Sequence, residues 1–257
     1  MPSQPLSIYN YHACAHAFSG GFTRPFHEVI DVQAPSALPI IGGYGASRVD
    51  NFKYREFISF KSGYTHVSGS LQAEDGSHNT LVTSTLEGLN LMDVVTADRI
   101  VSRLYSKHHP GKREAEITLV GSKFENLQIA GFKVKVDLDC ELFESVLTFE
   151  QARNEFTKDS KFRKIAVDPF KLGQDLPAPD HYGAFLCSCV KEIETDCPGI
   201  TRKGHCFHVK GFGKIFLAEL LIKHGERTLT MIRLEFGSST SGSGTGASTK
   251  SNGSHYP

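Results

Sequence analysis

The 257-residue chain lacks an excess of charge of either sign and has no long apolar run. Lys and Arg together number 28, as do Asp and Glu, so the composition offers no basic surface that would attract nucleic acid or an acidic membrane. No run of 18 apolar residues occurs, so no segment could cross a bilayer as a helix. We therefore expect no nucleic-acid partner and no membrane partner.

Export signals and the short motifs of several enzyme classes are also missing. Residues 1–7 carry no Lys or Arg, and the next stretch is interrupted by polar side chains, which does not fit a secretory signal. The expected location is the cytoplasm, and a surface or extracellular location would need a non-classical export route. The sequence contains no G-x-S-x-G, Walker or H-E-x-x-H motif, so we predict no catalytic residue and no cofactor.

Most of the chain has the composition and periodicity of β-strands. β-Favouring runs occur at 52–71, 80–91 and 94–105. Near the C-terminal end, the runs 214–223 and 227–236 flank the turn residues 224–226, which is typical of a β-hairpin. These patterns predict a mainly β domain over residues 1–236.

The hydrophobic period changes to three and four residues between 141 and 165, which predicts a helical insertion in one or two pieces. Thr148 and Gln151 have the spacing of a capping box at the start of a helix. The prolines at 169, 177 and 179 then favour a long loop.

Three segments share a template in which an acid is followed by Asn or Gly. They are SRVDNFKY at 47–54, STLEGLNL at 84–91 and SKFENLQI at 122–129, so their starts lie 37 and 38 residues apart. Near-constant spacing is typical of repeated supersecondary units. Asn or Gly after the acid favours a positive φ and hence a bend in each strand. A β-sandwich and a solenoid-like stack of β units both fit such a repeat.

The stretches STLEGLNLMDVVTADRIV (84–101) and VGSKFENLQIAGFKVKVDLD (120–139) resemble the repeat of bacterial β-rich proteins of the choice-of-anchor type. They are also similar to uncharacterised standalone bacterial proteins of comparable length. The resemblance covers about residues 80–140. Proteins of that type are surface proteins, so the resemblance implies a β-rich fold and a surface location, and it carries over no catalytic residue.

Two groups of His and Cys residues are the candidate metal ligands. His12, Cys14 and His16 alternate along one run, which would place them on one face of a strand, and His205, Cys206 and His208 form the second group. Residues on alternate strand positions lie about 6–7 Å apart, so only two adjacent side chains of a group could share a zinc or copper ion unless another segment helps. We expect no stoichiometric metal, and a metal-binding module or metal-dependent enzyme is the alternative.

The last 21 residues, 237–257, are rich in Gly, Ser and Thr. This composition predicts a flexible tail, ordered only against a partner. The run at 7–18 carries few charges that would block the addition of a further strand. Together with zero net charge, these features predict a non-enzymatic, self-associating structural protein that forms a homo-oligomer, or a filament if the contact is head-to-tail.

Overall fold

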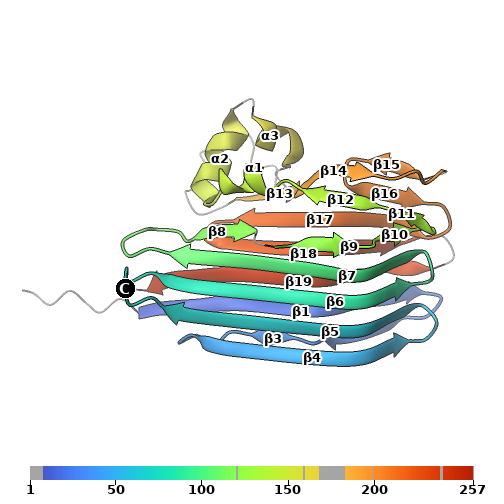
Figure 1. The fold of residues 1–257 in the computed structure, drawn as a ribbon, viewed down its shortest axis with the longest axis horizontal. Helices are drawn as coiled ribbons and strands as arrows, with labels where there is room; N and C mark the ends of the chain where they lie inside the picture. Colours follow the sequence, from blue (N-terminus) through green and yellow to red (C-terminus); the bar gives the residue numbers. More distant parts are fainter. Residues whose placement is uncertain are drawn as a thin grey trace, which may run out of the picture.

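The computed structural model describes residues 8–119, 121–158, 160–167, 183–198, 200–237 and 240–256. In this part of the chain the fold is mainly β, as the sequence predicts, and all strand pairs are antiparallel. Two large sheets lie face to face, and the helices and a small strand pair sit along one long edge (Figure 1).

Among the described residues, nine strands form the first sheet, here called sheet A. Its main path contains β15 (Thr201–Lys203), β16 (Cys206–Val209), β17 (Gly213–Lys223), β18 (Glu226–Phe236), β19 (Ser241–Tyr256), β1 (Ile8–Arg24) and β2 (Glu28–Gln33), in that order. Beside this path, β13 (Ala184–Ser188) pairs with β17, and β3 (Ser36–Ala37) pairs with β1. The hairpin predicted around 224–226 is confirmed, because Lys223 pairs with Glu226 across the turn from β17 to β18.

The second sheet, sheet B, has eight strands in the described part of the chain. Its path contains β11 (Phe132–Lys133), β10 (Gln128–Ile129), β7 (Val95–His108), β6 (His78–Leu91), β5 (Ile58–Leu71) and β4 (Gly43–Tyr54). Two short strands, β8 (Glu116–Leu119) and β9 (Lys123–Glu125), also pair with β7. The longest strands of sheet B are thus connected as successive hairpins.

The inner faces of the two sheets form a shared core. Fully buried side chains come from sheet B and from sheet A, and they include Leu86, Ile100, Leu104, Leu229, Ile232 and Leu234. Among these apolar side chains, hydroxyl groups also connect the layers: the Ser102 and Thr249 oxygens lie 2.7 Å apart. Ser84 Oγ also donates to the carbonyl oxygen of His16 at 2.8 Å. Apolar burial and these internal hydrogen bonds hold the layers together.

The predicted helical insertion consists of three short helices: α1 (Cys140–Glu144), α2 (Phe149–Thr157) and α3 (Lys161–Ile165). The capping box is confirmed, since the Thr148 hydroxyl accepts from the Gln151 backbone while the Gln151 side chain accepts from the Thr148 backbone. A small pair, β12 (Lys135–Leu138) and β14 (Val190–Glu194), flanks the helices. None of the helices in the described ranges is long and apolar enough to cross a membrane. The loop predicted around the three prolines lies outside the described residues.

The prediction of a flexible tail over 237–257 is wrong for residues 240–256. These residues contain β19, which lies inside sheet A between β18 and β1. Small residues suit this position, because large side chains approach β19 from neighbouring and facing strands: a Cβ added at Gly246 would lie 2.8 Å from Ile232 and 3.0 Å from Leu86. The domain predicted to end at residue 236 therefore continues through this strand.

The expectation that the N-terminal strand is free for strand addition is also wrong. Along its length, β1 pairs with β19 on one side and with β2 and β3 on the other. Its alternate side chains, Tyr11, Ala13 and Ala15, are buried. The few charges in this strand reflect an interior place in the sheet rather than an open edge.

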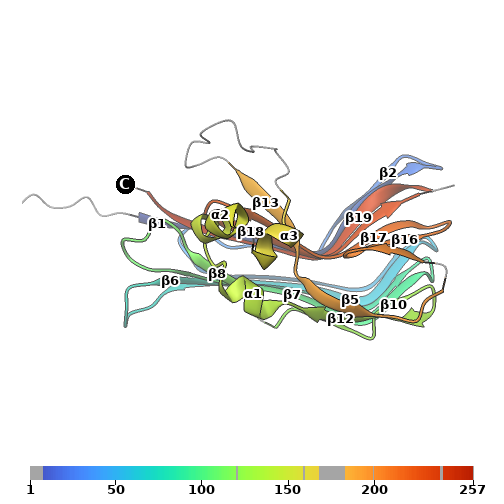
Figure 2. The same cartoon turned by 90° about the horizontal axis from the view of Figure 1, so that it is seen from above.

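Both sheets bend in the same direction part-way along their strands (Figure 2). Residues with positive φ interrupt alternate strands: Asn51, Gly88 and Asn126 have φ of 53°, 62° and 47° in sheet B. In sheet A, Ala218 and Ala247 have φ of 49° and 48°. The predicted bends after Asp50, Glu87 and Glu125 are therefore present, and such interruptions let a strand change direction without leaving its sheet.

Candidate functional site

The first group of candidate metal ligands lies on the outer face of β1. His12 and Cys14 are exposed and His16 is half-buried, while the residues between them are buried, so the predicted common face is correct. His16 Nε2 lies 3.2 Å from both Thr245 Oγ1 and Ser19 Oγ. Burial lowers the pKa of His16 and raises that of the Cys14 thiol. These contacts join β1 to β19 through side chains.

The second group is split between different surroundings. His205 Nε2 lies 3.3 Å from Glu219 Oε1, Cys206 is buried, and His208 is exposed on β16. Burial raises the pKa of Cys206 and so disfavours the thiolate that a metal would need. Strands β17, β18 and β19 separate β16 from β1, so the structure does not bring the two groups together.

Within the described ranges, the one group of three or more side chains with metal-ligand spacing is acidic. It contains Asp137, Glu192 and Glu194, whose ligand oxygens lie within 4.8 Å of one another on the β12–β14 pair. All three residues are exposed. Lys135 Nζ lies 3.3 Å from Glu194 and 3.7 Å from Asp137, so an ammonium group already balances part of this charge.

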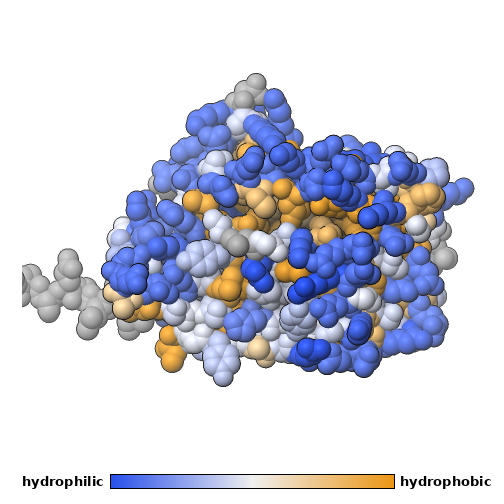
Figure 3. Space-filling model, in the orientation of Figure 1, coloured by the Kyte–Doolittle hydropathy of each residue, from blue (hydrophilic) through white to orange (hydrophobic). Residues whose placement is uncertain are grey.

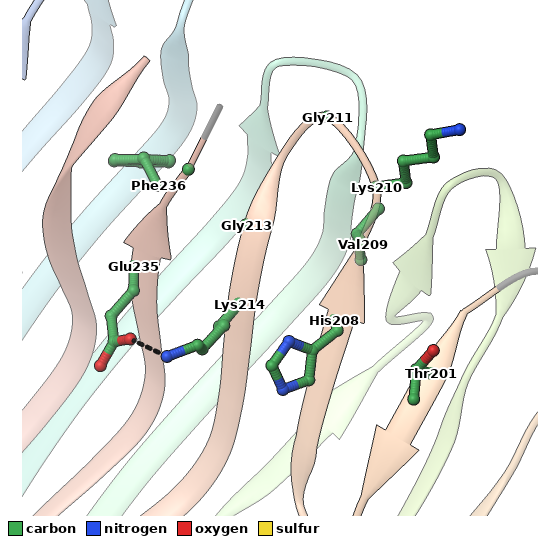
Figure 4. A pocket seen from close by; sticks show the side chains of 10 residues that line it. Thr201, His208, Val209, Lys210, Gly211, Gly213, Lys214, Glu235 and Phe236 are labelled. Atoms are coloured by element: carbon green, nitrogen blue, oxygen red, sulfur yellow. Dashed lines mark hydrogen bonds and ion pairs between the residues drawn. The ribbon is translucent and has the colours of Figure 1, made fainter. Parts of the chain in front are cut away.

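A pocket of about 590 Å³ opens on the outer face of sheet A, where β15 to β18 lie side by side (Figure 4). The strand register builds its wall: Thr201 lies opposite His208, His208 opposite Lys214, and Lys214 opposite Glu235. This face is on the concave side of the bend in sheet A (Figure 2). The pocket is lined by Thr201, His208, Val209, Lys210, Gly211, Gly213, Lys214, Glu235, Phe236 and Gly237.

An ionic network runs from this pocket toward the bend. Glu235 is held at one oxygen by Lys214 Nζ at 3.0 Å and at the other by Arg233 Nη1 at 2.5 Å. Arg233 also binds both oxygens of Glu219, with its Nη2 at 3.0 Å from Oε1. The guanidinium carbon lies 3.6 Å from the centre of the Phe216 ring, so a cation–π contact fixes the arginine between the two acids.

Burial and contacts with cations shift the pKa values of these carboxylates in opposite directions. Burial alone would raise the pKa of Glu219, but hydrogen bonds from His205 and Arg233 outweigh it and hold the pKa below its ordinary value. For Glu235 the same opposition holds, with Arg233 and Lys214 lowering the pKa. Both groups are therefore anions at neutral pH, and each is matched by a cation.

His205 and His208, which lie near this site, are candidates from the sequence, but the acids and the arginine of the site are not. A signal for them was present in the predicted hairpin. The turn in the structure is 224–225, one residue shorter than the predicted 224–226, and continuing the ladder outward from it places Phe216 opposite Arg233 and Lys214 opposite Glu235. The contact between Glu219 and His205 had no such signal, because it depends on where a separate strand pair packs.

A second exposed feature lies on the opposite sheet. β4 is the last strand of sheet B and pairs with β5, and its other side pairs with no strand among the described residues. Its first half, Gly43–Ser47, carries no charge. Beside it, Ile41 is 90% exposed, Tyr44 is 77% exposed, and Ile40 and Leu71 are also exposed. Figure 3 shows apolar surface at the lower left corner of this face, where β4 begins.

Comparisons with known proteins identify a family for this chain and no individual relative. No curated protein and no solved structure matches it. One family model matches residues 9–223, which extends from β1 to the end of β17 and includes all of sheet B. Since this range covers most of the sequence, the chain belongs to the family described as Domain of unknown function (DUF8256).

Proposed function

We propose that this protein is a non-enzymatic, self-associating structural protein whose two facing sheets form a β-sandwich, and that it pairs with a second copy of itself through β4. The observation that carries the proposal is the outer edge of β4, which pairs with no strand in the described ranges and lies beside four exposed apolar side chains. An open sheet edge presents backbone donors and acceptors that a further strand can satisfy.

The properties of β4 favour an identical partner. Natural edge strands are commonly protected by charged side chains or bulges. The segment Gly43–Ser47 carries no charge and pairs with β5 without interruption, and after Gly43 the next positive φ in β4 comes at Asn51. In a two-fold arrangement, antiparallel pairing brings the same uncharged segment together from both copies. Ile41 and Tyr44 of each copy would then lose exposed apolar area at the joint.

This contact differs from the one expected from the sequence alone. The N-terminal strand and the C-terminal segment pair with each other, so neither is free to reach a neighbour. A two-fold contact through β4 uses the same surface on both copies and closes on itself. We therefore propose a dimer in place of a filament.

We also infer that the segments 47–54, 84–91 and 122–129 are copies of one unit. Support comes from their positions: 47–54 lies in β4, 84–91 lies in β6, and 122–129 extends across β9 and β10. β5 separates the first segment from the second, and β7 separates the second from the third. Leu89 and Leu127, at matching positions, are both buried. The resemblance to choice-of-anchor-type repeats agrees with a structural role. The metal-binding alternative has less support, because the two His/Cys groups lie on well-separated strands.

The proposal is tested by adding a charge to the apolar corner. We expect the wild-type chain to be a dimer at tens of micromolar and Ile41→Lys or Tyr44→Lys to shift it to a monomer, measured by light scattering after size exclusion. Val167→Lys is the matched control, because it adds the same charge to another exposed apolar residue, away from β4. Circular dichroism confirms that each variant keeps its β structure. A wild-type monomer at about 100 µM would contradict the proposal.

A further inference from the structure

We propose that the pocket on the outer face of sheet A binds a small organic anion, a carboxylate or a phosphate ester that carries an apolar group. The site is distinct from the β4 edge, which belongs to the other sheet. Its volume of about 590 Å³ lies in the range of small-molecule sites.

The charges around the pocket favour an anion. The network contains two carboxylates, those of Glu219 and Glu235, and each of their oxygens already contacts a cation. The same region contains three cations, those of Lys210, Lys214 and Arg233. Positive charge therefore exceeds negative charge even when the histidines are neutral. An arriving anion would therefore meet no unpaired carboxylate.

Two groups on the wall are free to bind. In the part of the chain that the structure describes, neither the His208 nor the Lys210 side chain has a hydrogen bond or ion pair, and both line the pocket. His208 points across the sheet toward Lys214, while Lys210 is at the hairpin turn that forms the rim (Figure 4). Lys214 can share its ammonium protons between Glu235 and a ligand, because an ammonium has three donors.

Apolar surface beside these groups favours a ligand that also carries an apolar group. Val209 and Phe236 also line the pocket, and Phe236 is a core residue that packs on Phe212 and Phe22. Phe236 is only 6% exposed, so the apolar side chain within reach of a ligand is the half-buried Val209. A ligand with its anionic group at His208 and Lys214 could place an apolar group against Val209. A purely inorganic anion would leave this surface uncovered, so an organic anion fits better.

Binding is tested by calorimetry and by NMR with three probes: phenyl phosphate, benzoate and the neutral benzyl alcohol. We expect saturable binding of at least one anion and none of the alcohol, and the two anions distinguish a phosphate ester from a carboxylate. His208→Ala and Lys214→Ala should each weaken binding about tenfold, since each removes a charge-assisted contact.

Lys223→Ala is the matched control. Lys223 is on β17 like Lys214, but at the far end, where it pairs with Glu226. This variant should bind as the wild type does. The absence of saturable binding of either anion up to about 10 mM, or unchanged affinity in both pocket variants, would overturn the inference. The dimer test above is independent of this result.

Discussion

The carboxylate of Glu219 is buried in sheet A, with 8% of its side chain exposed. Removing an acid from water is unfavourable unless cations and donors replace the water. Arg233 and His205 provide that replacement, and Arg233 is fixed in turn by Glu235 and by the Phe216 ring. Glu219 thus keeps its charge because these side chains replace the water that would otherwise stabilise its carboxylate.

Glu219→Gln should lower the free energy of unfolding at pH 7 by about 3 kcal/mol, because it removes one partner from a buried ion pair. The folded-state pKa of Glu219 lies below its ordinary value of 4.5, so its stabilising effect is complete above that value and is lost as the pH falls through the folded-state pKa. The difference between variant and wild type should therefore shrink as the pH falls below 4.5. Urea denaturation at several pH values measures the free energy of unfolding of both proteins and so gives this difference.

Glu56→Gln is the control for this experiment. Glu56 pairs with Lys53 at 2.9 Å, but its side chain is 87% exposed, so the change should cost less than about 1 kcal/mol. A pH-independent difference between Glu219→Gln and wild type would show that packing, rather than the charge, is what the variant loses.

Backbone bends at single residues were predictable only where the residue type favours them. Asn51, Gly88 and Asn126 follow an acid in the repeated template, and Asn and Gly adopt positive φ more readily than other residues. Ala218 and Ala247 have the same conformation, yet alanine has no preference for it. Those two bends arise from the packing of sheet A as a whole, so no local pattern in the sequence identifies them.

At the scale of elements, the hairpin β17–β18 and the helices were predictable because their periodicity is local. β19 was not, because Gly and Ser disfavour strands in isolation. A period of two was nevertheless present: Gly244 and Gly246 are buried, while Ser243 between Gly242 and Gly244 is exposed. The glycines make room for Phe18, Ile232 and Leu86, so their suitability depends on residues far away in the sequence.

Gly246→Val tests this explanation of β19. A Cβ at this position would lie 2.8 Å from Ile232 Cγ2 and 3.0 Å from Leu86 Cδ1, so the larger side chain must displace core residues. We expect a loss of about 1–3 kcal/mol in the free energy of unfolding, measured with urea. Ser243→Val on the exposed face of the same strand should change stability by less than about 0.5 kcal/mol. Equal effects of the two variants would argue against a packed Gly face.

At the scale of the whole molecule, the two ends of the sequence meet in one sheet. β1 and β19 pair from Ile8 with Tyr256 through to Arg24 with Ser241, and β19 pairs on its other side with β18. The path of sheet A therefore reaches β1 and β2 only through β19. Contacts between such distant residues are costly in loop-closure entropy, and sheet A is continuous only with the last strand in place, so folding depends on that strand.

A chain that ends at Gly237 should therefore fail to fold cooperatively, because it lacks the strand between β18 and β1. We expect such a chain to show no cooperative urea transition and to aggregate through the two exposed strand edges, as measured by circular dichroism and light scattering. A synthetic peptide of residues 238–257, added during refolding, should restore the transition, whereas a scrambled peptide of the same composition should not. A truncated chain that unfolds cooperatively by itself would mean that β19 adds to a sheet that is already complete.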